Sequence, residues 1–84
     1  MRIEIRELTM EEVVLIKEAT GRSLIGELAT GDAAAIFDEQ MTSALVWIVR
    51  RRSTPRLAFK TVYSTLTLDE FSAVEVDLGS PKED

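Results

Sequence analysis

The segment Ala44-Leu45-Val46-Trp47-Ile48-Val49, followed directly by Arg50-Arg51-Arg52 and Ser53-Thr54-Pro55, decides how this chain folds. Six consecutive apolar residues project on all sides of a helix, so they cannot form a single amphipathic stripe. The same chain or another protein must therefore cover them on several sides. The arginines and the proline mark the end of the helix, because cations suit its partial negative charge and proline stops the pattern.

The residues before this apolar run extend the same helix toward the N-terminus. One face carries apolar side chains at the three- and four-residue spacing of an α-helix, namely Ile36, Phe37, Met41, Ala44, Leu45 and Ile48. Polar residues interrupt the other face in the first half only. We therefore expect one central helix at about 33–51, with Asp32 as its N-cap and Trp47 in the core.

A capping signature begins the first expected helix, within the segment Leu-Thr-Met-Glu-Glu-Val at 8–13. Thr9 can cap the helix and Glu12 can return a hydrogen bond to the backbone of the cap, while apolar residues flank this box in the positions of a hydrophobic staple. We expect the helix to end just before Gly21, which can adopt the left-handed cap conformation.

Three shorter helices are expected as well. Ser23 can cap a second helix that runs through Leu28, and residues 57–63 carry apolar side chains on one side of a fourth. The Thr-x-x-Glu arrangement recurs at 66–71 and predicts a last helix over about 68–72.

The two ends of the chain alternate between apolar and polar residues. Ile3 and Ile5 are separated by charged residues, and Val74, Val76 and Leu78 repeat the pattern. This period favours two short strands that pair with each other, but a loosely ordered arm at each end is an equal alternative.

The predicted fold class is therefore mainly α. We expect a single helical domain at 1–78, a small bundle of about four to five short helices around the central one, with the terminal strand pair left open. Residues 79–84 are expected to form a disordered polar tail.

The composition argues against several classes of function. The chain contains no histidine and no cysteine, which removes the usual general base, disulfides and thiolate zinc sites. Its net charge of −5 argues against a nucleic-acid surface. The adjacent carboxylates Glu11-Glu12 and Asp69-Glu70 fall in first helical turns, where the helix dipole favours them. We expect no enzyme activity, no metal and no cofactor.

Targeting and membrane signals are not expected either. The first residues lack the apolar stretch of a signal peptide, and the longest apolar run is far shorter than the roughly 18 residues that span a bilayer. A soluble protein without a membrane partner is the expectation.

Several segments, in this order, resemble the small tail assembly chaperones of long-tailed bacteriophages. They are Thr20-Gly21-Arg22-Ser23-Leu24, Gly31-Asp32, Ala44-Leu45-Val46-Trp47 leading into Arg51-Arg52, Pro55 with Leu57 and Phe59, and the segment with Leu66, Asp69 and Phe71. The resemblance covers about residues 10–78 and is strongest in the Ala-Leu-Val-Trp run. Ala58-Phe59-Lys60-Thr61 departs from the family, which tends to place a Thr or Ser cap and acidic residues there.

The resemblance implies a helical protein made in the host bacterial cytoplasm and absent from the mature virion. It implies the tape measure protein as partner, whose apolar helical segments are kept soluble while the tail tube assembles. A longer, frameshifted form of the chaperone is a second implied partner, and Ser80-Pro81-Lys82 is compatible with ribosomal slippage. A weak homo-oligomer stays open.

Apolar residues on amphipathic helices are the candidate partner contacts. They are Val14, Phe37, Met41, Val62 and Tyr63. The pattern does not separate a core face from a binding face. Two other classes also stay open: a small structural virion or head–tail connector protein that packs in an oligomer, and a regulatory module that binds a host protein.

Overall fold

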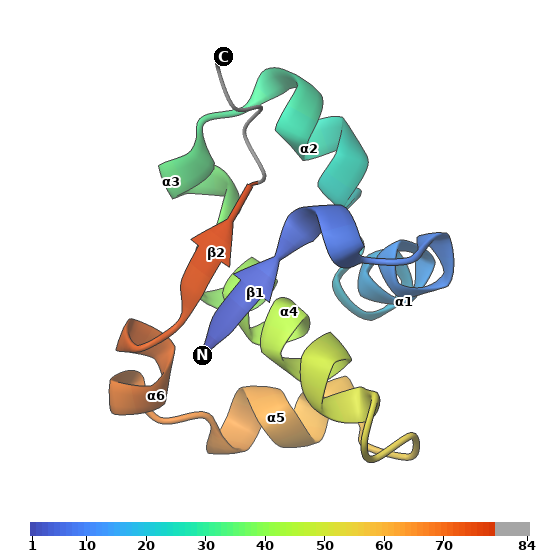
Figure 1. Cartoon of the computed structure of the whole chain (residues 1–84), viewed down its shortest axis with the longest axis vertical. Helices are drawn as coiled ribbons and strands as arrows, with labels where there is room; N and C mark the ends of the chain where they lie inside the picture. The colour runs from blue at the N-terminus through green and yellow to red at the C-terminus, as the bar shows by residue number, and fades with distance from the viewer. Residues whose placement is uncertain (79–84) are drawn as a thin grey trace.

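A computed structural model describes residues 1–78 of the chain, and these residues form six helices and a two-stranded sheet (Figure 1). In chain order the elements are β1 (Arg2–Glu4), the 3₁₀ turn η1 (Ile5–Glu7), α1 (Met10–Thr20), α2 (Leu24–Thr30), α3 (Ala33–Ile36), α4 (Glu39–Arg51), α5 (Phe59–Thr65), α6 (Leu68–Ser72) and β2 (Glu75–Asp77). The mainly helical class is confirmed. The expected tail at 79–84 lies outside the described residues.

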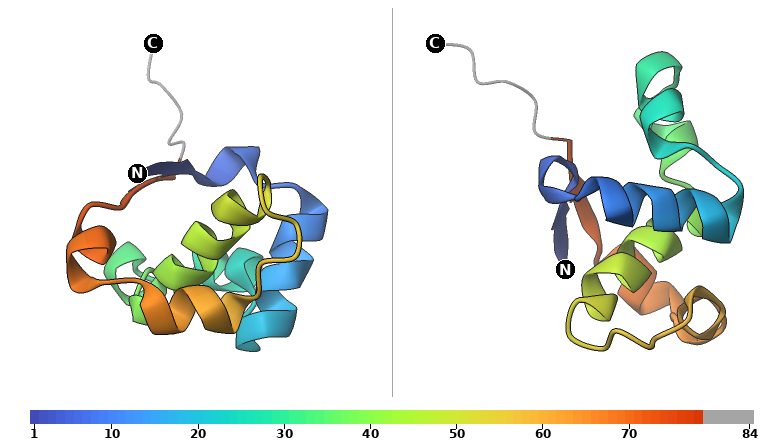
Figure 2. Two further views of the ribbon diagram at one scale, coloured as in Figure 1. Left: turned by 90° about the horizontal axis from the view of Figure 1, so that it is seen from below. Right: turned by 90° about the vertical axis from the view of Figure 1, so that its right-hand side faces the viewer.

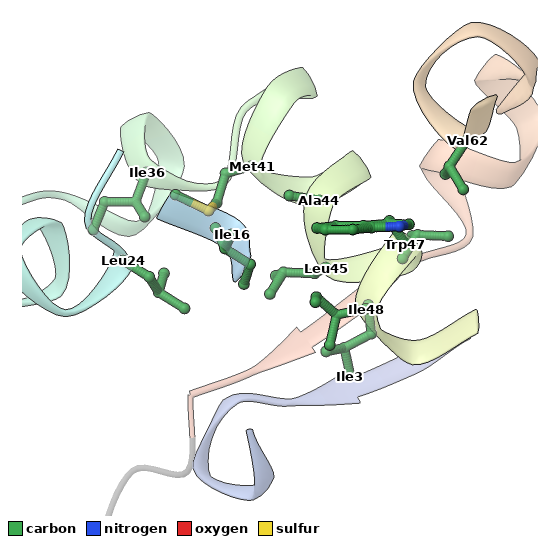
Figure 3. Close-up of a cluster of buried hydrophobic side chains, with 11 residues drawn as sticks. Ile3, Ile16, Leu24, Ile36, Met41, Ala44, Leu45, Trp47, Ile48 and Val62 are labelled. Carbon is green, nitrogen blue, oxygen red and sulfur yellow. The ribbon is translucent and has the colours of Figure 1, made fainter. Parts of the chain in front are cut away.

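Helix α4 is the centre of the molecule. Every residue from Met41 to Ile48 is buried, and Val49 is half-buried. Helices α1, α5 and α6 and strand β1 all contact α4, and side chains of several of these elements converge on it in Figure 3. The prediction that the apolar run is covered on several sides is confirmed, and the same chain supplies the cover.

The expected single helix at 33–51 is wrong, because the chain breaks at Phe37 and Asp38. Phe37 leaves the helical conformation (φ −93°, ψ 55°), and the Asp38 carboxylate accepts a hydrogen bond from the backbone N–H of Met41 at 3.0 Å. An aspartate that caps its own downstream backbone competes with helix continuation. Asp32 does stand at the N-cap position of α3, but its side chain makes no capping bond.

The expected helix starts and stops are otherwise close to the structure. Thr9 forms the capping box of α1, Gly21 ends that helix with φ 74°, and the Ser23 side chain caps α2. Helix α5 begins two residues later than expected, since the carbonyl of Leu57 is turned toward Trp47 and accepts its indole N–H at 2.7 Å.

The terminal segments pair as strands, which settles the alternative that the sequence left open. Strands β1 and β2 run parallel with Ile3 opposite Val76, and they lie side by side in Figures 1 and 2. Ile3 is buried, so the sheet closes one side of the core. Ile5 belongs to the 3₁₀ turn instead of the strand. Within residues 1–78, no helix combines the length and the apolar character needed to cross a membrane.

Candidate functional site

An apolar hollow with exposed walls lies where α4, α5 and α6 meet. Helices α5 and α6 lie at one end of the molecule (Figure 1). Glu39 and Ser43 line it from α4, Tyr63 lines it from α5, and the segment Leu66-Thr67-Leu68 and Phe71 complete it. Its volume is about 280 Å³. We call it the α5–α6 groove.

A second hollow of about 140 Å³ adjoins this groove through the shared residue Leu66. Its walls include Val46 and Val74, with the ion pair of Arg50 and Glu70 at its edge (3.6 Å). Leu66 therefore lies between the two hollows, and the carboxylate at the edge of the second hollow is already paired with a cation.

The groove exists because α6 is too short to bury its own apolar residues. The five-residue helix is held by the Thr67 capping box, and none of its residues is buried. Leu66 and Phe71 occupy the staple positions and are half-buried, whereas Leu68 at the first helical position is 78% exposed. A leucine in such a position adds apolar surface to the outside of the molecule.

A chain of aromatic rings connects the groove to the core. The rings of Trp47 and Phe59 pack edge-to-face with their centroids 5.7 Å apart, and Phe59 stacks on Tyr63 at 5.3 Å. Trp47 is 6% exposed and Tyr63 is 50% exposed, so the chain runs from interior to surface. The tyrosine ring is therefore held in place by packing, and it offers a fixed apolar face to a partner.

The polar groups of the groove differ in what they bind. The Thr67 side chain and backbone N–H are both bonded to Glu70, and the backbone N–H of Thr67 lowers the pKa of the Glu70 carboxyl. Glu39, by contrast, is exposed and has no cation within ion-pair distance among the described residues. Among residues 1–78, Glu39 is the single charged residue that lines the groove.

The structure separates the five predicted contact residues. Tyr63 lines the groove, Val14 is exposed on α1 away from it, and Phe37 is half-buried between α3 and α4. Met41 and Val62 are 0% and 2% exposed and belong to the core of this structure. Helical spacing marks any apolar face, whether it covers the core or a partner, so the pattern grouped these two core residues with exposed ones.

Sequence reasoning missed Leu66, Leu68 and Phe71 as groove residues. The signal was present, since a helix over 68–72 carries two apolar residues and follows a third, yet offers less than two turns to bury them. Counting apolar residues against helix length would have marked this segment as incompletely covered.

The turn at Thr20–Ser23 is a structural cross-link. The guanidinium of Arg22 donates to Glu27 at 2.7 and 2.9 Å and to Asp38 at 2.8 Å, and it also reaches the carbonyl of Ile36 at 3.2 Å. The arginine therefore links α2 to the start of α4, and carboxylates of the same chain neutralise its charge. The hydrogen bonds from Arg22 to Glu27 also lower the pKa of the Glu27 carboxyl.

No protein-family model, no curated protein and no solved structure matches this chain. The groove and the resemblance carried by the sequence segments are therefore the basis for a functional assignment.

Proposed function

We propose that this chain is a tail assembly chaperone of a long-tailed bacteriophage, which binds the tape measure protein and keeps its apolar helical segments soluble during tail assembly. The observation that carries the proposal is the α5–α6 groove, an exposed apolar surface with a rigid aromatic wall. The resemblance of the Ala-Leu-Val-Trp run and its flanking segments supplies the class of partner.

The mechanism is reversible burial of a client helix in this groove. The groove is open, with Tyr63 and Leu68 half or more exposed, and each contact with a client helix is weak enough for tube protein to displace it. Many copies along one long client act together through avidity. The net charge of −5 keeps the loaded complexes soluble.

The proposal includes a place and time of action. The chaperone works in the cytoplasm of the infected host, leaves when the tube has formed and is absent from the mature virion. A longer, frameshifted form of the chain is a second proposed partner; its slippage site at Ser80-Pro81-Lys82 lies beyond the described residues.

Co-expression tests the proposal directly. A fragment of the cognate tape measure protein is expressed alone and with this chain, and its soluble fraction and co-purification are measured. We expect the soluble fraction to rise and a complex to be isolated. Unchanged solubility without a complex contradicts the proposal. Mass spectrometry of purified virions separates the classes, because a virion that contains the chain favours a structural or connector protein.

A further inference from the structure

The walls of the α5–α6 groove include apolar side chains that the described residues leave half or more exposed. Tyr63 and Leu68 are 50% and 78% exposed, on two different helices that face the same hollow. Exposed apolar groups are common singly, but groups from separate elements that converge on one concave surface indicate a place where another molecule packs.

Three backbone N–H groups at the groove are already hydrogen-bonded within the chain, which restricts the form of that molecule. The N–H of Leu66 bonds to the carbonyl of Val62 at 2.8 Å, and the N–H groups of Thr67 and Glu70 are taken up by the capping box. Within residues 1–78, no strand edge lines the groove, since none of its lining residues belongs to β1 or β2. The backbone N–H and C=O groups of a partner must therefore be hydrogen-bonded within the partner itself, and an α-helix meets this condition.

The charge at the groove restricts the partner further. Ser43 stands one turn after Glu39 on the same face of α4, and both line the hollow. The Glu39 carboxylate has no cation of the described chain beside it, whereas Glu70 at the neighbouring hollow is paired with Arg50. An unpaired anion at the edge of an apolar groove is complementary to a cation at the edge of an apolar helix.

We propose that the α5–α6 groove binds an amphipathic helix whose apolar side chains cover Tyr63 and Leu68 and whose lysine or arginine pairs with Glu39. This names the chemistry of the client segments and so rests on the proposed function. Basic amphipathic segments of the client are selected over neutral or acidic ones of equal hydrophobicity.

Synthetic peptides of stated composition test this inference on the full chain. Three labelled helical peptides carry the same leucines at three- and four-residue spacing and either Lys, Gln or Glu at the flanking position. We expect fluorescence anisotropy to rank their affinities Lys above Gln above Glu, with steps of about threefold at low salt, because an exposed ion pair contributes modestly. High salt compresses the ranking.

Two pairs of variants locate the effect. Glu39→Gln should abolish the ranking, whereas Glu11→Gln, which changes another unpaired glutamate in a first helical turn, should leave it unchanged. Leu68→Ser should weaken all three peptides about tenfold through lost apolar burial. Met10→Ser is its control, since Met10, like Leu68, is an exposed apolar residue at the first helical position, directly after a threonine N-cap.

The outcomes distinguish this inference from the proposed function. Equal affinities for the three peptides, or equal effects of Glu39→Gln and Glu11→Gln, overturn the inference. The inference is also overturned if the chain binds none of the peptides and Leu68→Ser changes its sedimentation coefficient, because that result assigns the groove to a second copy of the chain. If the tape measure fragment co-purifies equally with all variants, the function stands and the inference fails. If the peptides rank as expected but the tape measure fragment does not bind, the inference about the groove stands and the proposed function fails.

Discussion

Trp47 is the residue on which the core and the groove both depend. Its ring packs edge-to-face with that of Phe59, and its indole N–H donates to the carbonyl of Leu57, which fixes the loop before α5. One side chain therefore joins α4 to α5 and supports the stacked ring of Tyr63 at the surface.

Trp47→Ala is expected to destabilise the fold by about 3–5 kcal/mol, because it opens a large cavity and leaves the carbonyl of Leu57 without its donor. Small domains have only about 5–15 kcal/mol of stability, so the variant should be close to unfolding. Urea denaturation measures the loss, and Tyr63→Ala, at a half-exposed ring, should cost far less. An unchanged denaturation midpoint for Trp47→Ala would show that the core is misplaced.

At the scale of elements, the capping boxes of α1 and α6 share the Thr-x-x-Glu sequence pattern but differ in the residues around them. In α1 the box glutamate, Glu12, also receives a bidentate pair of bonds from Arg52 at 2.9 and 3.0 Å. In α6 the box glutamate, Glu70, meets Arg50 only at 3.6 Å. The arginines expected to end the central helix thus also hold the starts of two other helices.

Removing each cap should separate stability from binding. Thr9→Ala is expected to cost about 1 kcal/mol and lower the melting temperature by about 4–8 °C, because α1 packs on α4 and contributes Ile16 to the core. Thr67→Ala should change the melting temperature less, since no residue of α6 is buried, but weaken peptide binding at the groove. Thermal scans and peptide anisotropy on both variants check this. Equal effects of the two variants on both readouts would contradict it.

At the scale of the whole molecule, ion pairs between distant segments hold the helices and the termini together. Arg22 connects Glu27 and Asp38, Arg52 connects α4 to Glu12, and Arg2 pairs with Asp77 across the two strands. These carboxylates gain partners on folding, so their protonation is coupled to stability.

Acid should therefore unfold this protein. The hydrogen bond from Arg52 lowers the pKa of the Glu12 carboxyl. Burial raises the pKa of the Asp38 carboxyl, but the hydrogen bonds from the Met41 N–H and from Arg22 outweigh burial, so the net pKa of Asp38 is lowered. A carboxyl with a lowered folded pKa stabilises the fold above its ordinary pKa of 4.5 or 3.8, and this contribution is lost as pH falls through the folded value.

We expect the urea midpoint to change little from pH 7 to about 5.5, where no histidine titrates, and to fall below about pH 4.5. Glu12→Gln should flatten part of this acid limb, whereas Glu11→Gln, whose carboxylate has no ion-pair partner among the described residues, should not. A midpoint that is independent of pH down to 3 would show that these pairs do not stabilise the fold.

The features predicted correctly from the sequence depend on residues a few positions apart. The capping boxes at Thr9 and Thr67 and the left-handed cap at Gly21 follow from local hydrogen bonding, and the burial of Trp47 follows from an apolar run that no helix can leave half-exposed. Tyr63 was the one groove residue predicted, because an apolar residue on an amphipathic helix is a candidate for either face.

The sequence by itself thus determined the helical class, the starts of α1, α2 and α6 and the enclosed position of α4, since each is set by short-range patterns. Only the tertiary structure decided that Asp38 breaks the central helix, because its partners include Arg22, sixteen residues away. It also placed Met41 and Val62 inside and Leu68 outside, and it paired Ile3 with Val76. Burial depends on which distant segment arrives to cover a face, and no local pattern carries that information.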